Sequence, residues 1–399
     1  MPGYERLLNL SLRAKLAFVV GVLAVPVLAL MGLQFFQQEG TISRTSSEKA
    51  GLAYLNEAVF PLLTKIERHR TLAGAAAGGD TTVAADLEVA RTDVDAAMAT
   101  LKAKDRNHGK SWGTDKLVAE AVAAWESART TSSRASVEQD TKILDEQLLP
   151  LVSKVGDASK LFADPDIATR NAIAGIVEHW VAFEEAQTRA AAYTAIVTGT
   201  ERAFQPAARV EVVRAQQAAA ASSEAMFDRL NASFVDNSAY TASLERTLTE
   251  STQQTEVSRA LITALVNPDG SLSGSAQRAA QESAKLTAAN EALYRETSRL
   301  VSDDFGARVS AGRAIQFVTL GSSLGALGAA IALAAFVSRS ITRPINELAE
   351  AADKMSLGEL DIEIPTLGDN EVGKLAESLR RMQVSMRGAI ERLRARRAA

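Results

Sequence analysis

The chain has 399 residues, a net charge of −4 and no cysteine. The lack of cysteine excludes disulfide frameworks, thiolate metal sites and cysteine nucleophiles. Aromatic residues make up only 5% of a sequence that is rich in alanine, which favours helices over sheets. A chain of this length is expected to form about two or three domains.

Two uncharged apolar segments, 16–36 and 314–337, are each long enough to cross a membrane. A hydrocarbon core of about 30 Å needs roughly 20 residues of helix. The first segment could instead be a cleaved signal peptide. Its apolar run exceeds a typical signal core, however, and no small-x-small cleavage site precedes the polar region. We therefore predict an uncleaved anchor and a two-pass membrane protein.

Basic residues indicate the orientation of the two spans. Arg6, Arg13 and Lys15 precede the first span, and Arg339 and Arg343 follow the second. The positive-inside rule then places both termini in the cytoplasm of a bacterium and the large middle domain in the periplasm. Because basic charge gathers beside the spans and at the C-terminal end, a nucleic-acid partner is not expected. The predicted parts are a cytoplasmic segment (1–15), transmembrane helices (16–36 and 314–337), a periplasmic domain (37–313), a relay (338–392) and a basic tail (393–399).

The relay segment shows two heptad seams with spacings of three and four residues. The first contains Ile341, Ile345, Leu348, Ala352 and Met355, and the second contains Val372, Leu375, Leu379, Met382, Met386, Ala389 and Leu393. Such seams are typical of helices in a parallel bundle.

Local signals mark the ends of these two relay helices. Pro344 stands near the start of the first helix, where its missing N–H does least harm. Gly358 is expected to end that helix, and Asn370 to cap the second, with Glu371 near its positive end. Between them an extended connector would be anchored by Ile362, Ile364 and Leu367.

This segment resembles the HAMP domain of bacterial sensor kinases and chemoreceptors. Its predicted order is a helix that continues the membrane span, then an extended connector, then a second helix. The matching residues are Arg339, Pro344, Leu348, Gly358, Glu371, Gly373 and Leu375, while Asn370 replaces the family's common aspartate. The resemblance implies a homodimer whose parallel four-helix bundle converts movement of the membrane helix into changed packing. The residues expected to carry this relay are Pro344, Ile345, Leu348, Gly358, Glu371, Val372, Leu375 and Leu379. An ordinary juxtamembrane helical hairpin is the alternative.

No catalytic domain is recognisable after the relay. His69, His108 and His179 all precede the second span, so no cytoplasmic histidine can accept a phosphoryl group, and no glycine-rich phosphate loop follows. We expect no enzyme activity, no catalytic residue, no metal and no cofactor, and an output that depends on a cytoplasmic signalling partner. Three alternatives stay open for the basic tail: a solvated charged terminus, attachment to anionic lipid, or truncation of a longer chemoreceptor or kinase.

The outer domain, 37–313, predicts an all-α bundle of about six to eight helices, either one long bundle or two stacked bundles. A faint internal repeat places Arg70 and Arg189 at similar distances before Gly79 and Gly199. A second pattern consists of residues 48–54, 69–70, 157–159 and 164–166 together with Arg189. This pattern resembles the nitrate- and nitrite-sensing and the helical bimodular sensor domains. Thr71 stands where the family's common His-Arg-Gly has glycine.

Arg70 and Arg189 are the candidate ligand-binding residues, and Arg68 is a third candidate. We expect the first two to face one pocket between helices and to bind a small anion such as a carboxylate or nitrate, because a guanidinium group holds a planar anion by two parallel hydrogen bonds. The alternative is that both arginines pair with Glu67 or Glu185.

Two functions from different classes fit these features. The first is a membrane receptor that senses a small solute outside and relays the signal through its HAMP domain. The second is an adaptor whose outer bundle binds an envelope protein and whose inner bundle docks a signalling partner. Converging arginines in a cavity would favour the receptor, and an exposed apolar patch would favour the adaptor.

Overall fold

The computed structural model describes residues 12–199, 205–236, 276–366, 368 and 370–398, with isolated positions between 241 and 256. These residues form helices joined by short turns, and no strand occurs among them, which confirms the all-α prediction. The chain divides into two compact units, one formed by Gly40–Gly312 and the other by Met1–Glu39 with Arg313–Ala399.

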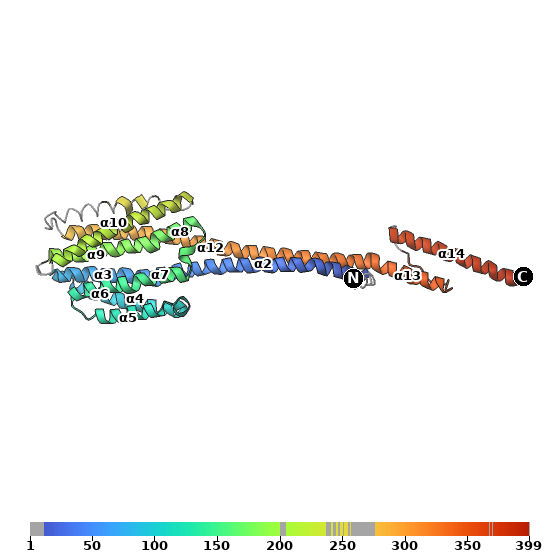
Figure 1. Ribbon diagram of the computed structural model, residues 1–399, viewed down its shortest axis with the longest axis horizontal. Coiled ribbons are helices and arrows are strands. Elements are labelled where there is room, and N and C mark those ends of the chain that lie inside the picture. Colours follow the sequence, from blue (N-terminus) through green and yellow to red (C-terminus); the bar gives the residue numbers. More distant parts are fainter. Residues whose placement is uncertain are drawn as a thin grey trace, which may run out of the picture. The chain divides into compact units, whose positions relative to one another are not determined.

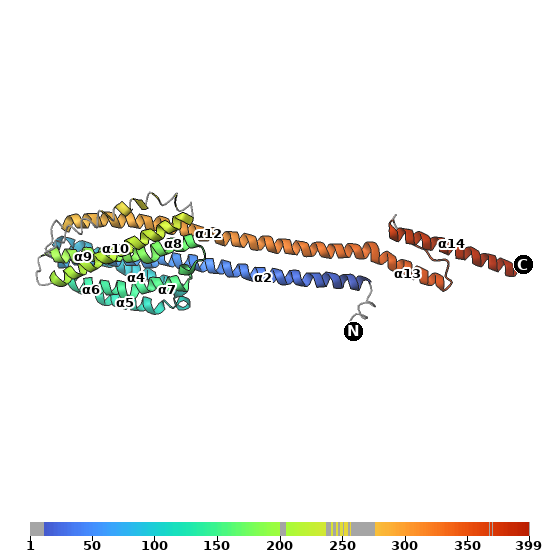
Figure 2. The ribbon, with the colours of Figure 1, turned by 45° about the horizontal axis from the view of Figure 1, so that its top comes forward.

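The larger unit is a bundle whose helices run side by side (Figures 1 and 2). Its elements are the end of α2 (Leu12–Tyr54), η1 (Leu55–Val59), α3 (Phe60–Ala77), η2 (Thr81–Val83), α4 (Ala84–Trp112), α5 (Asp115–Ala128), α6 (Ser133–Ile143), η3 (Leu144–Leu148), α7 (Leu149–Ala158), η4 (Leu161–Ala163), α8 (Ile167–Ile173), η5 (Ala174–His179), α9 (Trp180–Thr198), α10 (Gln205–Asp236) and the start of α12 (Ala276–Val337).

The contact between helices α3 and α9 joins two groups of helices in this bundle. Helix α3 packs against α4, α6 and α9, and α9 packs in turn against α10. One continuous apolar core includes Leu63 of α3, Leu144 of η3, Ile176 of η5 and Phe305 of α12. Complete burial of each such side chain contributes roughly 1.5–3 kcal/mol. The two groups of helices therefore share one apolar core.

Prolines explain three of the π-helical segments in the described residues. η1, η3 and η7 (Ser338–Thr342) each end two residues before a proline, namely Pro61, Pro150 and Pro344. Proline lacks an N–H and its ring crowds the carbonyl of the preceding turn. A single wider turn lets the helix continue past the ring.

The faint repeat seen in the sequence has a structural counterpart. The segment η1 begins at Leu55, and η5 begins at Ala174. Leu55 precedes Arg70 by the same number of residues as Ala174 precedes Arg189. Each π-helical segment leads directly into the helix that carries the arginine. The repeat thus places both arginines on corresponding helices, α3 and α9.

The smaller unit contains the predicted membrane segments. Its described residues expose large apolar side chains such as Val25 (65%), Phe36 (75%) and Phe317 (74%), which require a cover of lipid or further helices. Among the described residues, the helical stretch Ala288–Ser356 is the one long and apolar enough to cross a membrane by length and composition. The predicted first span, 16–36, falls partly on side chains outside the described residues and stays a prediction.

Candidate functional site

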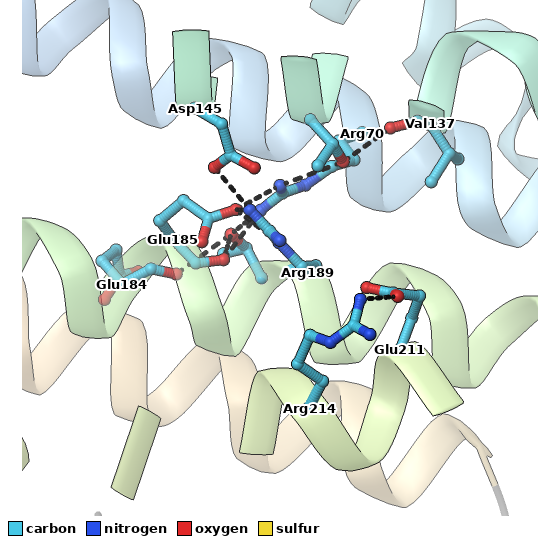
Figure 3. A network of polar contacts seen from close by, with 10 residues as sticks. Arg70, Val137, Asp145, Glu184, Glu185, Arg189, Glu211 and Arg214 are labelled. Atoms are coloured by element: carbon cyan, nitrogen blue, oxygen red, sulfur yellow. Dashed lines mark hydrogen bonds and ion pairs between the residues drawn. The ribbon is translucent and has the colours of Figure 1, made fainter. Parts of the chain in front are cut away.

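Arg70 of α3 is completely buried inside the bundle (Figure 3). Its terminal nitrogens donate to the Glu185 carboxylate at 2.6 Å, to the Glu185 backbone carbonyl at 2.8 Å and to the Thr188 hydroxyl at 2.7 Å. A buried guanidinium ion is tolerated only with such partners, because its charge has lost its water.

Arg189 lies one helical turn after Glu185 and binds the same carboxylate. Its Nε donates to Glu185 Oε1 at 2.9 Å, and its Nη2 donates to Asp145 Oδ1 of η3 at 2.5 Å. Figure 3 shows both arginines directed at Glu185 between α3 and α9. The predicted convergence of Arg70 and Arg189 is therefore present, and so is the pairing with Glu185 that the sequence offered as the alternative. Their anion-binding role stays a prediction.

Arg68, the third candidate, lies apart from this cluster. Its side chain is half exposed and donates to Asp93 of α4 at 3.2 Å. The backbone geometry of α3 explains the separation, because residues two positions apart point to different faces of a helix.

Glu67, one turn before Arg70, is buried with an exposed fraction of only 2%. Burial raises its pKa well above the usual range, the neighbouring Glu184 raises it further, Arg70 opposes the shift, and Glu185 adds to it. Oε1 of Glu67 has no hydrogen-bond partner among the described residues. From the sequence alone, Glu67 stands out only as a pairing partner, because a glutamate in a charged helical run resembles a solvated residue.

His69 and Asp140 form a second buried contact in the same cluster. His69 Nδ1 lies 2.6 Å from Asp140 Oδ2, and both side chains are fully buried. The His69 ring also meets Trp125 edge to face. Burial raises the pKa of Asp140, while the hydrogen bond from His69 lowers it, as do the charges of Arg70 and Arg91. No signal in the sequence pointed to Asp140, because it lies on a different helix, α6.

A separate ionic cluster joins the first and last helices of this unit. Arg308 of α12 binds Asp164, which follows η4, and Arg44 Nε donates to Glu48 Oε1 of α2 at 2.9 Å. Glu48 and Asp164 are both fully buried. Burial raises the pKa of Glu48, Arg44 opposes this, and Asp164 raises it further.

The relay helices are α13 (Arg343–Ser356) and α14 (Glu371–Ala398). Pro344 lies in the first turn of α13, and Gly358 follows its end with a φ of 90°. Asn370 Oδ1 accepts a hydrogen bond from the Gly373 N–H at 2.9 Å, which is the predicted N-cap of α14. Both predicted helix boundaries are thereby confirmed.

The connector is held against α14 by a side-chain amide. Gln383 Nε2 donates to the carbonyls of Leu360 and Ile362 at 3.0 and 2.7 Å. Ile364 is buried in the same small core, whereas Leu367 lies outside the described residues. Leu348, Ala351, Met355 and Ala376 complete this core, with Val372 and Leu379 packed partly against it. Ala352, which the seam predicted, is less buried than Ala351.

The remaining part of the second seam is exposed within one chain. Leu375 (53%), Met382 (44%) and Leu393 (62%) share one face of α14 with Met386, while Ile345 and Pro344 of α13 are half-buried and Glu371 is exposed. An apolar stripe at heptad spacing requires a partner helix to cover it.

Residues 336–388 match the model of the HAMP domain. A protein of Acetivibrio thermocellus that carries the name of a sensory transducer is 45% identical to this chain over 58 residues. The similarity covers 14% of this chain and 10% of that relative. No solved structure matches the chain. The HAMP domain, its sensory relative and the apolar helix that precedes it support a membrane-anchored protein of signal transduction.

Proposed function

We propose that this protein is a homodimeric, two-pass receptor of the bacterial inner membrane. It senses a small solute outside the membrane and passes the signal through its HAMP domain to a cytoplasmic partner. The observation that carries the proposal is the direct succession of an apolar helix, the π-helical segment η7 and the HAMP helix α13. A wider turn of this kind often marks a functional site in a helix.

The exposed seam of α14 supports the homodimer. Leu375, Met382 and Leu393 recur at heptad-compatible spacing and have no apolar cover within one chain. A second copy of the same helix would cover them in a parallel bundle.

An anion is the solute class that Arg70 and Arg189 suggest. Both guanidinium groups already bind Glu185, so an anion would have to take the place of that carboxylate. Such an exchange of one anion for another would change the contacts between α3 and α9. It would link ligand binding to helix packing.

The adaptor alternative receives less support. In the described part of the larger unit, the exposed large apolar side chains are Val89, Ile167, Val210 and Val213, and these lie on three different helices. A docking surface for an envelope protein would gather such side chains in one patch.

Two measurements on the full chain in lipid nanodiscs test the proposal. The melting temperature is measured in the presence of small carboxylates and of nitrate, and at least one of these ligands should raise it. The gain should be lost in Arg189→Gln and retained in the matched control Arg68→Gln. Because the chain has no cysteine, Leu375→Cys provides a unique thiol whose disulfide should form between two copies. Absence of that disulfide, together with absence of any ligand effect, would contradict the receptor.

A further inference from the structure

Five carboxyl groups and four basic groups of the described residues gather around α3 and α9. The carboxyl groups are Glu67 of α3, Asp140 of α6, Asp145 of η3 and Glu184 and Glu185 of α9. The facing basic groups are Arg70 and His69 of α3, Arg189 of α9 and Arg91 of α4. A buried carboxylate with an oxygen that lacks a hydrogen-bond partner is strongly disfavoured, and uptake of a proton removes its charge at least cost.

The hydrogen bonds within the cluster single out Glu67. Arg70 and Arg189 both bind Glu185, and Arg189 also binds Asp145. Glu67 instead faces the carboxyl groups of Glu184 and Glu185, with Oε1 unpartnered and an exposed fraction of 2%. A second carboxylate beside an unpartnered carboxyl oxygen favours the protonated form.

We propose that the carboxyl pair of Glu67 and Glu184 is a proton-binding site through which this receptor also responds to the pH outside the membrane. The inference rests on the proposed receptor function and adds an input that is distinct from an anion at the arginines. The transferred species is a single proton, which leaves water and resides on a carboxyl oxygen of the pair.

Polar side chains lead from the surface at η3 towards the buried pair. Asp145 is 40% exposed, Arg189 is 16% exposed and Glu185 is 7% exposed, so exposure falls stepwise towards the buried pair. The pKa of Asp145 is also raised, chiefly by burial and then by the charge of Glu185. Protons can therefore enter from the side of η3 without opening of the apolar core.

Loss of the proton would place two like charges on facing helices that have no space to rearrange. A Cβ atom on Gly74 of α3 would lie 2.5 Å from the carbonyl oxygen of Ala192 of α9, which shows how closely the two backbones approach. Repulsion at the pair would therefore separate α3 from α9 as rigid elements.

Aromatic contacts connect this interface to α12. Trp180 of α9 stacks on Tyr294 of α12 with ring centroids 4.4 Å apart, and Phe60 of α3 meets both rings edge to face. A shift between α3 and α9 would therefore act on α12, whose later residues form the apolar helix before the HAMP domain.

The test uses the full chain in nanodiscs with Glu67→Gln, Glu184→Gln and the matched control Glu126→Gln, an exposed glutamate of α5. Infrared spectroscopy at neutral pH should show the carbonyl band of a protonated carboxyl group. The band should disappear in one of the first two variants and persist in the control. Persistence of the band in both variants, or its absence from the wild type, would overturn the site.

Thermal unfolding against pH provides the second readout. The unfolded chain releases the proton of a glutamate near pH 4.3, about the ordinary pKa, whereas the folded chain retains it to higher pH. Folding stability of the wild type should therefore fall as pH rises between these two pKa values. In Glu67→Gln this part of the fall should be absent, so that its melting temperature exceeds that of the wild type by about 2–4 °C or more at alkaline pH. Equal slopes in wild type and variant would overturn the site.

The disulfide of Leu375→Cys separates failure of this inference from failure of the receptor. Because the thiolate is the reacting species, the rate of disulfide formation depends on pH in every variant, and the readout is the ratio of the rates with and without Glu67→Gln. A ratio that changes with pH supports both inferences. Disulfide formation with infrared and thermal behaviour unchanged in Glu67→Gln and Glu184→Gln supports the receptor and overturns the proton site. Expected infrared and thermal results with a ratio that is constant with pH overturn the sensing role of the pair.

Discussion

Arg308 donates from one terminal nitrogen to both carboxylate oxygens of Asp164, at 3.1 and 3.0 Å. The same guanidinium group donates from Nη2 to the Thr169 hydroxyl at 2.6 Å, and Glu48 of α2 lies beside Asp164. Helices α2 and α12, which lead to the two apolar segments, thus meet the connector before α8 at one ionic cluster. This cluster therefore fixes the position of α12 relative to α8 within the larger unit.

Replacement of Arg308 should loosen this end of the bundle. Arg308→Gln leaves the fully buried Asp164 without its principal cationic partner, and we expect a loss of about 2 kcal/mol in the free energy of unfolding. The loss is smaller than for a completely buried pair because Arg308 retains contact with water. Denaturant unfolding of the full chain measures the change. Arg299→Gln, a control on the exposed face of the same helix, should change stability by about 0.5 kcal/mol or less.

Removal of the Asp166 side chain should destabilise the start of α8 in a pH-dependent manner. Asp166 Oδ1 accepts from the Thr169 N–H at 2.8 Å as an N-cap. Burial alone would raise the pKa of Asp166, but its hydrogen bonds with Thr169 and the charge of Arg308 lower it. A lowered pKa stabilises the fold above the unfolded value of about 3.9, and this contribution is lost as pH falls through the folded pKa. Asp166→Ala should therefore cost about 1 kcal/mol at neutral pH and less in acid.

Unfolding curves at several pH values check this prediction. Asp157→Ala, which removes an exposed carboxylate of α7, is the control. An equal effect of Asp166→Ala at neutral and acidic pH would show that the cap does not depend on the ionised carboxylate.

A methyl group on Gly74 should disrupt the contact between α3 and α9. A Cβ atom there would lie 2.5 Å from the Ala192 carbonyl oxygen and 2.8 Å from its Cα, both backbone atoms that cannot rotate away. We expect Gly74→Ala to lower the free energy of unfolding by about 1–3 kcal/mol. Gly40→Ala in α2 has nothing within 4 Å of the new Cβ and should be stabilising by about 0.5–1 kcal/mol. Stability changes of the same sign in both variants would contradict this account of the interface.

The backbone at Gly358 should be sensitive to any side chain. Its φ of 90° is disfavoured for L residues, although no atom lies within 4 Å of the place that a Cβ would take, so the cost comes from the backbone alone. Gly358→Ala should cost about 1 kcal/mol and expose the connector after α13 to faster proteolysis. Gly388→Ala, a helical and equally unobstructed position in α14, should slow unfolding or leave it unchanged.

The relay was predictable from the sequence because its signals are local. Heptad spacing defines the apolar face of a helix, and a glycine or asparagine at a helix end acts through its own backbone or the next turn. Gly358 and Asn370 therefore lie where the sequence places them. The apolar segment before Arg339 was predictable for the same reason, since its length and composition need no partner to be recognised.

The interior of the larger unit depended on tertiary structure. The sequence by itself singled out Arg70 and Arg189, indicated their repeat and offered Glu185 as an alternative partner, but it did not decide that both arginines bind Glu185 or that Glu67 is buried beside them. A run such as Glu67-Arg68-His69-Arg70 is equally consistent with a solvated helix face. Only the lateral packing of α3 against α9 and α6 decides which of these charges lose their water, because burial of a helix face is determined by its neighbours and not by its own residues.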